Sequence, residues 1–202
     1  MMKRKLLPAV LAIIALCGCQ EKIITPEPIP SDPAVPLEIS MSTAELTKGL
    51  IKDTKLPDGS SVGITIKDDY GVYTGELFTN VKYTAEMESG NQVWSSDSPV
   101  MLSSETGTAY AYYPYADACT DITAISIRAN STVQTDFMWG IPVSVSKDNR
   151  KATLVMKHAL AAVRITYVRG TYSGTGNVSK VSFGGNCIAV AGTLDATDRS
   201  EE

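Results

Sequence analysis

The residue best suited to acid–base, nucleophilic or metal chemistry is His158, the chain's single histidine. One histidine cannot build a His-rich zinc site, and no two cysteines have the CxxC spacing that supplies thiolate ligands. A Ser-His-Asp triad would need a nucleophile, and no serine stands in a GxSxG turn. Because an apolar run follows His158, we predict a structural residue that hydrogen-bonds at a strand end. The sequence therefore predicts no metal site, no cofactor and no nucleophilic catalysis.

Carboxylates are the second group that could act on a substrate, since a pair flanking a glycosidic bond can serve as acid and base. The candidates are scattered through polar stretches: Asp68, Asp69, Glu86, Glu88, Asp195 and Asp198. No recognisable motif places two of them together, and charges on solvated loops explain them better. A glycan hydrolase stays open as an alternative, and our prediction is that the protein is not an enzyme.

An aromatic segment, residues 110–115, holds four tyrosines in six positions. Tyrosine offers a flat face and a hydroxyl at low entropic cost, which suits stacking on a sugar ring. A glycan platform would therefore use Tyr112, Tyr113, Tyr115 and the nearby Trp94. The alternative is an amphipathic strand whose tyrosines alternate between the core and its rim, and this alternative is favoured.

Cys19 is the residue for which the sequence indicates a covalent modification. Three basic residues near the N-terminus precede an apolar run at 6–16 that is too short to span a bilayer as a stable helix. The run ends in Leu16-Cys17-Gly18-Cys19, which resembles a bacterial lipobox with cleavage between Gly18 and Cys19. We predict a signal peptide at residues 1–18 and a diacylglyceryl group on Cys19. Residues 19–36 hold five of the ten prolines and are expected to form an extended tether.

The net charge of −4 at pH 7, which becomes more negative once the basic signal is removed, argues against nucleic acid as a partner. It also argues against electrostatic docking to anionic lipid, so attachment to a membrane must come from acyl chains. Two cysteines, Cys119 and Cys187, remain in the body of the chain. They could form a disulfide outside the cytoplasm, or they could be two small buried apolar residues.

Beyond residue 36 the sequence alternates between apolar and polar residues in short runs separated by Gly, Pro, Asn, Asp and Ser. This pattern predicts an all-β fold, an antiparallel sandwich or barrel of about seven to nine short strands. Only residues 158–162 have helical character, for one turn at most. The runs from which these strands would form are residues 37–43, 62–66, 81–85, 109–112, 125–127, 143–145, 154–156, 163–167, 178–183 and 188–191. A turn is expected at residues 57–59.

Seven short motifs occur in a fixed order along this β region, and together they resemble the fimbrillin-like lipoproteins, subunits of type V pili. They are Asn80-Val-Lys-Tyr83, Trp94-Ser-Ser-Asp97-Ser-Pro99, Ala109-Tyr-Ala-Tyr-Tyr-Pro-Tyr115, Phe137-Met-Trp139-Gly140, Lys157-His158-Ala159-Leu160, Ala162-Val163-Arg164-Ile165 and Gly192-Thr193-Leu194-Asp195. The resemblance implies a transthyretin-like β-sandwich at residues 37–197. It also implies an outer-membrane or cell-surface location, a lipid anchor and a non-enzymatic role in adhesion.

The resemblance further implies that a surface protease specific for Arg or Lys removes the first strand. In this chain the strand would be residues 37–43, and the cut would follow Lys48, Lys52 or Lys55. The vacated groove would accept an extended segment from another subunit, so the expected partners are other fimbrillin-type subunits. Family members continue into a second domain, whereas this sequence ends in a polar tail at residues 198–202. A surface glycan-binding lipoprotein on the same sandwich stays open as an alternative.

Overall fold

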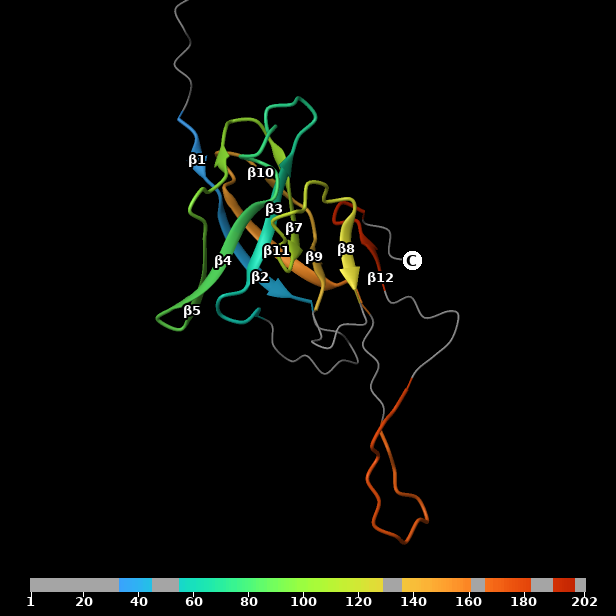
Figure 1. Cartoon of the computed structure of the whole chain (residues 1–202). Coiled ribbons are helices and arrows are strands. Elements are labelled where there is room, and N and C mark those ends of the chain that lie inside the picture. The colour runs from blue at the N-terminus through green and yellow to red at the C-terminus, as the bar shows by residue number, and fades with distance from the viewer. Residues whose placement is uncertain (1–32, 45–54, 129–135, 161–165, 183–190, 199–202) are drawn as a thin grey trace, which may run out of the picture. The chain divides into compact units, whose positions relative to one another are not determined.

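The computed structural model of the chain describes residues 33–44, 55–128, 136–160, 166–182 and 191–198. The described residues form strands, turns and loops, as the all-β prediction requires (Figure 1). Within these ranges no helix is long and apolar enough to cross a bilayer. The twelve strands are β1 (Val35–Pro36), β2 (Glu38–Thr43), β3 (Ser61–Lys67), β4 (Val81–Glu88), β5 (Asn91–Ser95), β6 (Met101–Leu102), β7 (Gly107–Tyr113), β8 (Ile125–Arg128), β9 (Met138–Gly140), β10 (Val143–Val145), β11 (Lys151–His158) and β12 (Ala191–Leu194).

Eight strands form one sheet in the order β2-β11-β9-β7-β3-β4-β5, with β10 paired to β7. The sheet curls, so that its two end strands, β2 and β5, contact each other. Two shorter ladders join β1 to β6 and β8 to β12. Within the described residues every ladder is antiparallel except that between β2 and β11, which is parallel. The prediction of a mostly antiparallel β-sandwich is therefore confirmed.

The core follows from the alternation of the strands. In β4 the buried Val81, Tyr83 and Ala85 point inward while Lys82 and Glu86 are exposed. The central strand β3 is different, because Val62 through Ile66 are buried on both of its faces. One face packs into the main cluster, and a second cluster formed by Tyr112, Ile122, Ile125 and Ala196 lies apart from it. The described fold therefore has two hydrophobic clusters around its central strands.

Two predicted strands are not present in the described residues. Tyr167, at the end of the expected strand 163–167, lies outside any strand and is 54% exposed, and residues 161–165 are outside the described ranges. Residues 178–182 likewise belong to no strand. Alternation alone does not make a strand, because each backbone N–H and C=O also needs a neighbouring strand to pair with. No ladder reaches described residues 166–182.

The predicted turn at residues 57–59 is confirmed. The N–H of Ser60 donates to the carbonyl of Pro57 at 3.1 Å, which closes a four-residue turn. Gly59 has a φ of +77°, the left-handed value that the third position of a type II turn requires. Glycine adopts this value without the steric cost of a Cβ atom.

Candidate functional site

The N-terminal strand segment, residues 35–43, connects two separate parts of the fold. Its first part, β1, pairs antiparallel with β6, so that Val35 lies opposite Leu102. Its second part, β2, pairs in parallel with β11, from Lys151 opposite Glu38 to Met156 opposite Thr43. Between the two ladders the N–H of Leu37 donates to the carbonyl of Val100 at 2.9 Å. We call the edges of β6 and β11 that receive this segment the acceptor site.

The pairing starts two residues earlier than the predicted boundary between tether and sandwich. The predicted tether includes Val35 and Pro36, whereas in the structure these two residues form β1. Proline lacks an N–H, but it is tolerated on an edge strand whose N–H would not be needed by the ladder. The ordered N-terminal segment therefore includes the last two residues of the Pro-rich stretch.

The inward face of the segment is apolar. Leu37 is 4% exposed and belongs to the main core cluster. Val35, Ile39 and Met41 are partly buried and pack against the same cluster. By register, Ile39 and Met41 lie beside Ala152 and Leu154 of β11, both of which are fully buried. The segment thus completes a core that the rest of the sheet leaves open at this position.

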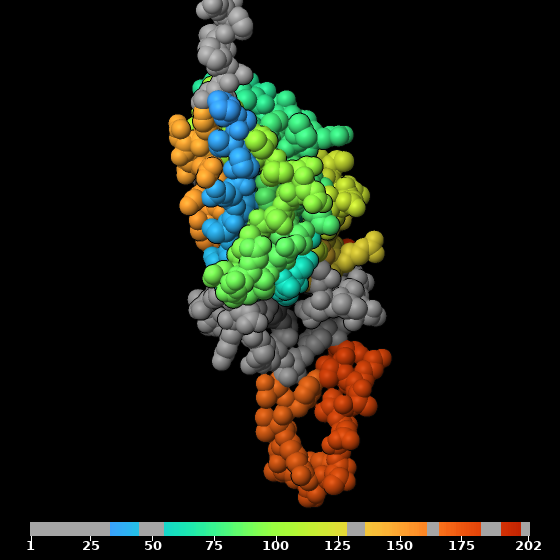
Figure 2. Space-filling view, turned by 90° about the vertical axis from the view of Figure 1, so that its left-hand side faces the viewer, coloured from blue at the N-terminus to red at the C-terminus, as the bar shows by residue number. Residues whose placement is uncertain are grey.

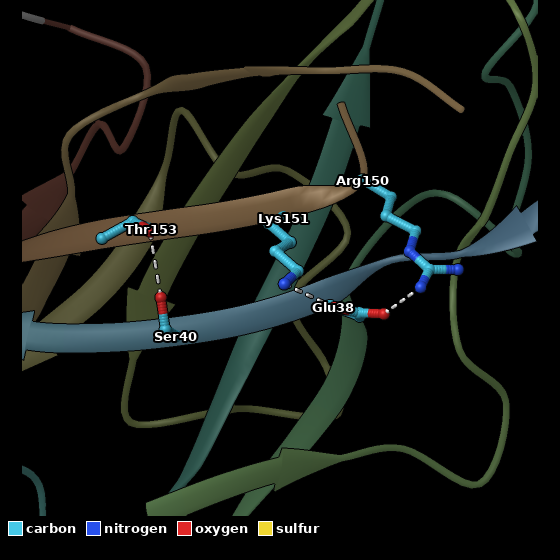
Figure 3. A network of polar contacts seen from close by, with 5 residues as sticks. All are labelled: Glu38, Ser40, Arg150, Lys151 and Thr153. Atoms are coloured by element: carbon cyan, nitrogen blue, oxygen red, sulfur yellow. Dashed lines mark hydrogen bonds and ion pairs between the residues drawn. The ribbon is translucent and has the colours of Figure 1, made fainter. Parts of the chain in front are cut away.

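The outward face of the segment is polar and contacts β11 through side chains (Figure 3). The Glu38 carboxylate forms an ion pair with the Arg150 guanidinium at 2.8 Å, and it lies 4.0 Å from the Lys151 ammonium. Two residues further on, the Ser40 hydroxyl donates to the Thr153 hydroxyl at 3.1 Å. The Glu38 and Arg150 side chains are each about half exposed, so solvent screens this pair. Figure 3 shows these contacts following one side of the parallel ladder.

The segment runs along the surface of the fold, and Leu37 is its one fully buried residue. In Figure 2 its blue atoms run as a stripe between the orange atoms of β11 and green atoms of the β4–β7 region. β2 is an end strand of the sheet, hydrogen-bonded to β11 on one side only. The segment can therefore leave without threading through any other part of the described fold.

Several predicted functional residues lie outside the described residues. They include Gly18 and Cys19 at the predicted lipidation site, and Lys48 and Lys52 in the predicted cleavage loop. Lys55, the third candidate, is described and exposed. Cys119 forms no disulfide, and its thiol lies 3.6 Å from the carbonyl oxygen of Asp121. Cys187, its candidate partner, is outside the described ranges.

Two of the four rings considered as glycan platforms are buried in the structure. Tyr112 is 1% exposed and Trp94 is 7% exposed, so neither presents a free face to a sugar. The Tyr112 hydroxyl donates to Asn80 Oδ1 at 2.7 Å and accepts from the N–H of Ala116 at 3.1 Å. Burial raises the pKa of Tyr112 above its ordinary value. Tyr112 is therefore a structural residue, as the amphipathic-strand alternative predicted.

Tyr113 and Tyr115 remain partly exposed. Tyr115 lines an open hollow of about 540 Å³ together with Asn80, Asp117, Cys119 and Thr120. The Lys82 ammonium lies 5.5 Å from the centre of the Tyr115 ring, a cation–π arrangement. A hydrogen bond with Asp117 raises the pKa of Tyr115. Of the two partly exposed rings, Tyr115 is the one that lines this hollow beside polar neighbours.

His158 and Asp68, two of the residues considered for catalysis, make contacts within the local structure. His158 ends β11, and its Nδ1 lies 2.8 Å from the carboxylate of Asp136, as expected for a histidine at a strand end. Asp68 accepts hydrogen bonds from the N–H groups of Tyr70, Val72 and Tyr73. The Val72 hydrogen bond is the main cause of the lowered pKa of Asp68. Across the described ranges no three His, Cys, Asp or Glu side chains are grouped as a metal site requires.

Glu38, Arg150 and Lys151 are the site residues that sequence reasoning missed. The alternation of residues 35–43 places Glu38 on the outward face, and that much was readable. Its partners are more than a hundred positions away in the sequence, and no local pattern pairs them. A charged residue among the hydroxyl residues of the outward face is the signal that could have drawn attention to Glu38.

Comparison with solved structures finds similar folds among Bacteroides proteins. A candidate cell adhesion protein from Bacteroides uniformis matches with a TM-score of 0.50 and 21% identity, over 63% of this chain and 49% of that one. A candidate cell adhesion protein from Bacteroides ovatus gives 0.48 and 20%, over 63% and 53% of the two chains. A fimbrial protein from Bacteroides ovatus gives 0.41 and 16%, over 62% and 28%. The chain thus spans about half or less of these proteins' length.

Comparison with curated proteins finds no match. Comparison with family models finds one described as fimbrillin-like, which matches residues 50–201. The match covers well over half of the sequence, and it includes every strand from β3 to β12. The sequence motifs in residues 80–195 predicted this result. The chain belongs to the fimbrillin-like family.

Proposed function

We propose that the protein is a surface lipoprotein that acts as a pilus subunit or a pilus-associated component, is assembled by strand exchange and contributes to adhesion. Family membership supports a structural rather than an enzymatic role at the cell surface. The proposal of strand exchange rests on the position and packing of the N-terminal strand segment. It fills the core from an edge position near one end of the chain, where it can be replaced.

The N-terminal sequence supports attachment to a membrane, and the resemblance to fimbrillin-like lipoproteins supports the outer membrane as that membrane. Signal peptidase would cut between Gly18 and Cys19 and leave a lipidated Cys19 as the first residue. A single acyl chain gives reversible binding, and the two or more chains of a lipoprotein give a stable anchor. The Pro-rich residues that follow would hold the domain away from the membrane as an extended tether.

Maturation would begin with a cut after Lys48, Lys52 or Lys55. All three follow β2 and precede β3, so a cut at any of them separates the N-terminal strand segment from the rest of the domain. Its departure would leave β11 as an unpaired edge and would expose the buried side chains beneath Leu37. Unpaired backbone groups beside an apolar surface are best satisfied by another strand. An extended segment from a second subunit is the partner that fits.

Intact-protein mass spectrometry on material sheared from native cells tests this proposal. We expect a species that begins just after one of the three lysines and occurs in high-molecular-weight assemblies. A Lys→Ala substitution at the cleaved position should abolish that species, while Lys180→Ala, at an exposed lysine outside the loop, should leave it unchanged. A species that begins only at acylated Cys19 and stays in the membrane fraction would contradict maturation by strand removal.

Glycan binding is a second proposal, supported by the open hollow beside Tyr115. The partly exposed ring can stack on a sugar, and Asp117 and Thr120 can hydrogen-bond to its hydroxyls. Binding to a glycan array that is lost in Tyr115→Ala and kept in Tyr172→Ala, an exposed tyrosine elsewhere, would support it. The absence of binding by the unmodified chain would refute it.

A further inference from the structure

We infer that the acceptor site selects its incoming strand by charge: it favours a strand that runs parallel to β11 and carries an acidic residue opposite Lys151. This inference rests on the proposed strand exchange and adds the chemical identity of the partner segment. It is drawn from the contacts that the chain's own N-terminal strand segment makes in the same place.

The direction of the incoming strand follows from the β2–β11 ladder. Six consecutive residue pairs, from Glu38 opposite Lys151 to Thr43 opposite Met156, are in parallel register. The backbone groups of β11 are arranged for that register, with the Arg150 carbonyl accepting from the N–H of Glu38 and the Met156 carbonyl from the N–H of Ala44. A strand in the opposite direction would need a different hydrogen-bond spacing along β11.

The selection of charge follows from two cations at the start of β11. Arg150 and Lys151 both face the one carboxylate of Glu38. With the N-terminal segment gone, two positive charges would stand side by side at the edge of the site. An incoming acid would restore the pairing, whereas a basic residue at that position would meet two like charges. Discrimination therefore comes from repulsion of the wrong strand as well as attraction of the right one.

The remaining positions complete the pattern of the partner strand. The residue before the acid and the first and third residues after it occupy the places of Leu37, Ile39 and Met41, and these must be apolar. The second residue after the acid lies opposite Thr153, where Ser40 now donates a hydrogen bond, so a hydroxyl side chain fits there. The site therefore accepts an extended segment with the pattern apolar, acidic, apolar, hydroxyl, apolar.

The test is strand replacement in the full chain, carrying a site-specific protease sequence between residues 48 and 52. After cleavage, a fluorescein-labelled peptide of residues 33–44 competes with the chain's own segment. We expect it to bind, and a Glu38→Lys peptide to bind about tenfold more weakly at low salt, with the difference shrinking at 1 M salt. A body that carries Arg150→Glu and Lys151→Glu should reverse this preference.

The outcomes distinguish charge selection from strand exchange itself. Equal binding of the two peptides would refute charge selection and leave strand exchange intact. Failure of the reversed body to prefer the Glu38→Lys peptide, with circular dichroism showing that it is folded, would also refute charge selection. Failure of both peptides to bind the cleaved body would refute strand exchange itself, and the inference with it.

Discussion

Truncation of Leu37 tests most directly whether the N-terminal strand segment belongs to the cooperative fold. The Leu37 side chain is 4% exposed and lies in the main core cluster. Replacing a buried leucine by alanine costs about 2–5 kcal/mol, depending on how far the surroundings collapse into the cavity. Its neighbours Val35 and Ile39 are only partly buried, so some collapse is possible here. We therefore expect Leu37→Ala to lower the free energy of unfolding by about 2–3 kcal/mol.

Urea unfolding of the full chain, followed by tryptophan fluorescence, measures this loss. For a chain of this size the expected change corresponds to a fall in Tm of about 4–12 °C. The control is Ser40→Ala, at an exposed position of the same strand whose hydrogen bond to Thr153 is open to solvent. That substitution should change stability by no more than about 0.5 kcal/mol. Equal stabilities of the two variants would refute the placement of Leu37 in the core.

The same substitution makes a second measurement possible in the cleaved protein. A peptide of residues 33–44 carrying Leu37→Ala should bind the acceptor site about 30- to 160-fold more weakly, which is the same free energy expressed as affinity. Agreement between the two free energies would show that Leu37 stabilises the core equally when its strand is part of the chain and when it is a separate peptide. A large loss of stability without a loss of affinity would contradict that equivalence.

Three further predictions concern the rest of the domain. Gly63→Ala should destabilise it by about 1–3 kcal/mol in urea unfolding, since a Cβ there would lie 2.6 Å from Asn80 Oδ1 and against the Tyr112 ring. Tyr112→Phe should cost about 1–2 kcal/mol in the same assay, because Asn80 Oδ1 loses its buried donor. The third concerns Asp68, whose pKa is lowered in the folded state. Its contribution to folding stability is therefore present above pH 3.8 and is lost as the pH falls through its folded pKa. NMR shifts of the amides at 70–73 should titrate below pH 3.8, and Asp68→Asn should remove that titration.

The sequence predicted best those strands that are buried on one face. In β4 and β11 apolar residues alternate with polar ones, and the structure buries most of the apolar set, namely Val81, Tyr83 and Ala85 in β4 and Ala152, Leu154 and Met156 in β11. Alternation was misleading for residues 178–182, where the pattern is present and no partner strand is described. A strand depends on neighbours that can be distant in sequence, and a single segment holds no information about them.

The acceptor site could be predicted only through the family resemblance. Alternation placed residues 37–43 in a strand, but nothing local indicated that the strand pairs with β11 in parallel. Ser40 and Thr153 are separated by 113 positions, and the register between them depends on the whole intervening chain. The pairing of Pro36 is unpredictable for a related reason, because it depends on the position of β6 beside it.

A single cut between β2 and β3 could change the behaviour of the N-terminal strand segment without changing any of its contacts. In the intact chain the connection to β3 holds the strand segment near its site at a high effective concentration, so a free strand cannot compete. Cleavage after β2 leaves the buried side chains, the hydrogen bonds and the Glu38 ion pairs in place and removes only this connection. The segment then becomes a ligand with a finite dissociation rate, and a partner strand with the same pattern can replace it. On this argument the cut strand should exchange with labelled peptide while the uncut strand does not.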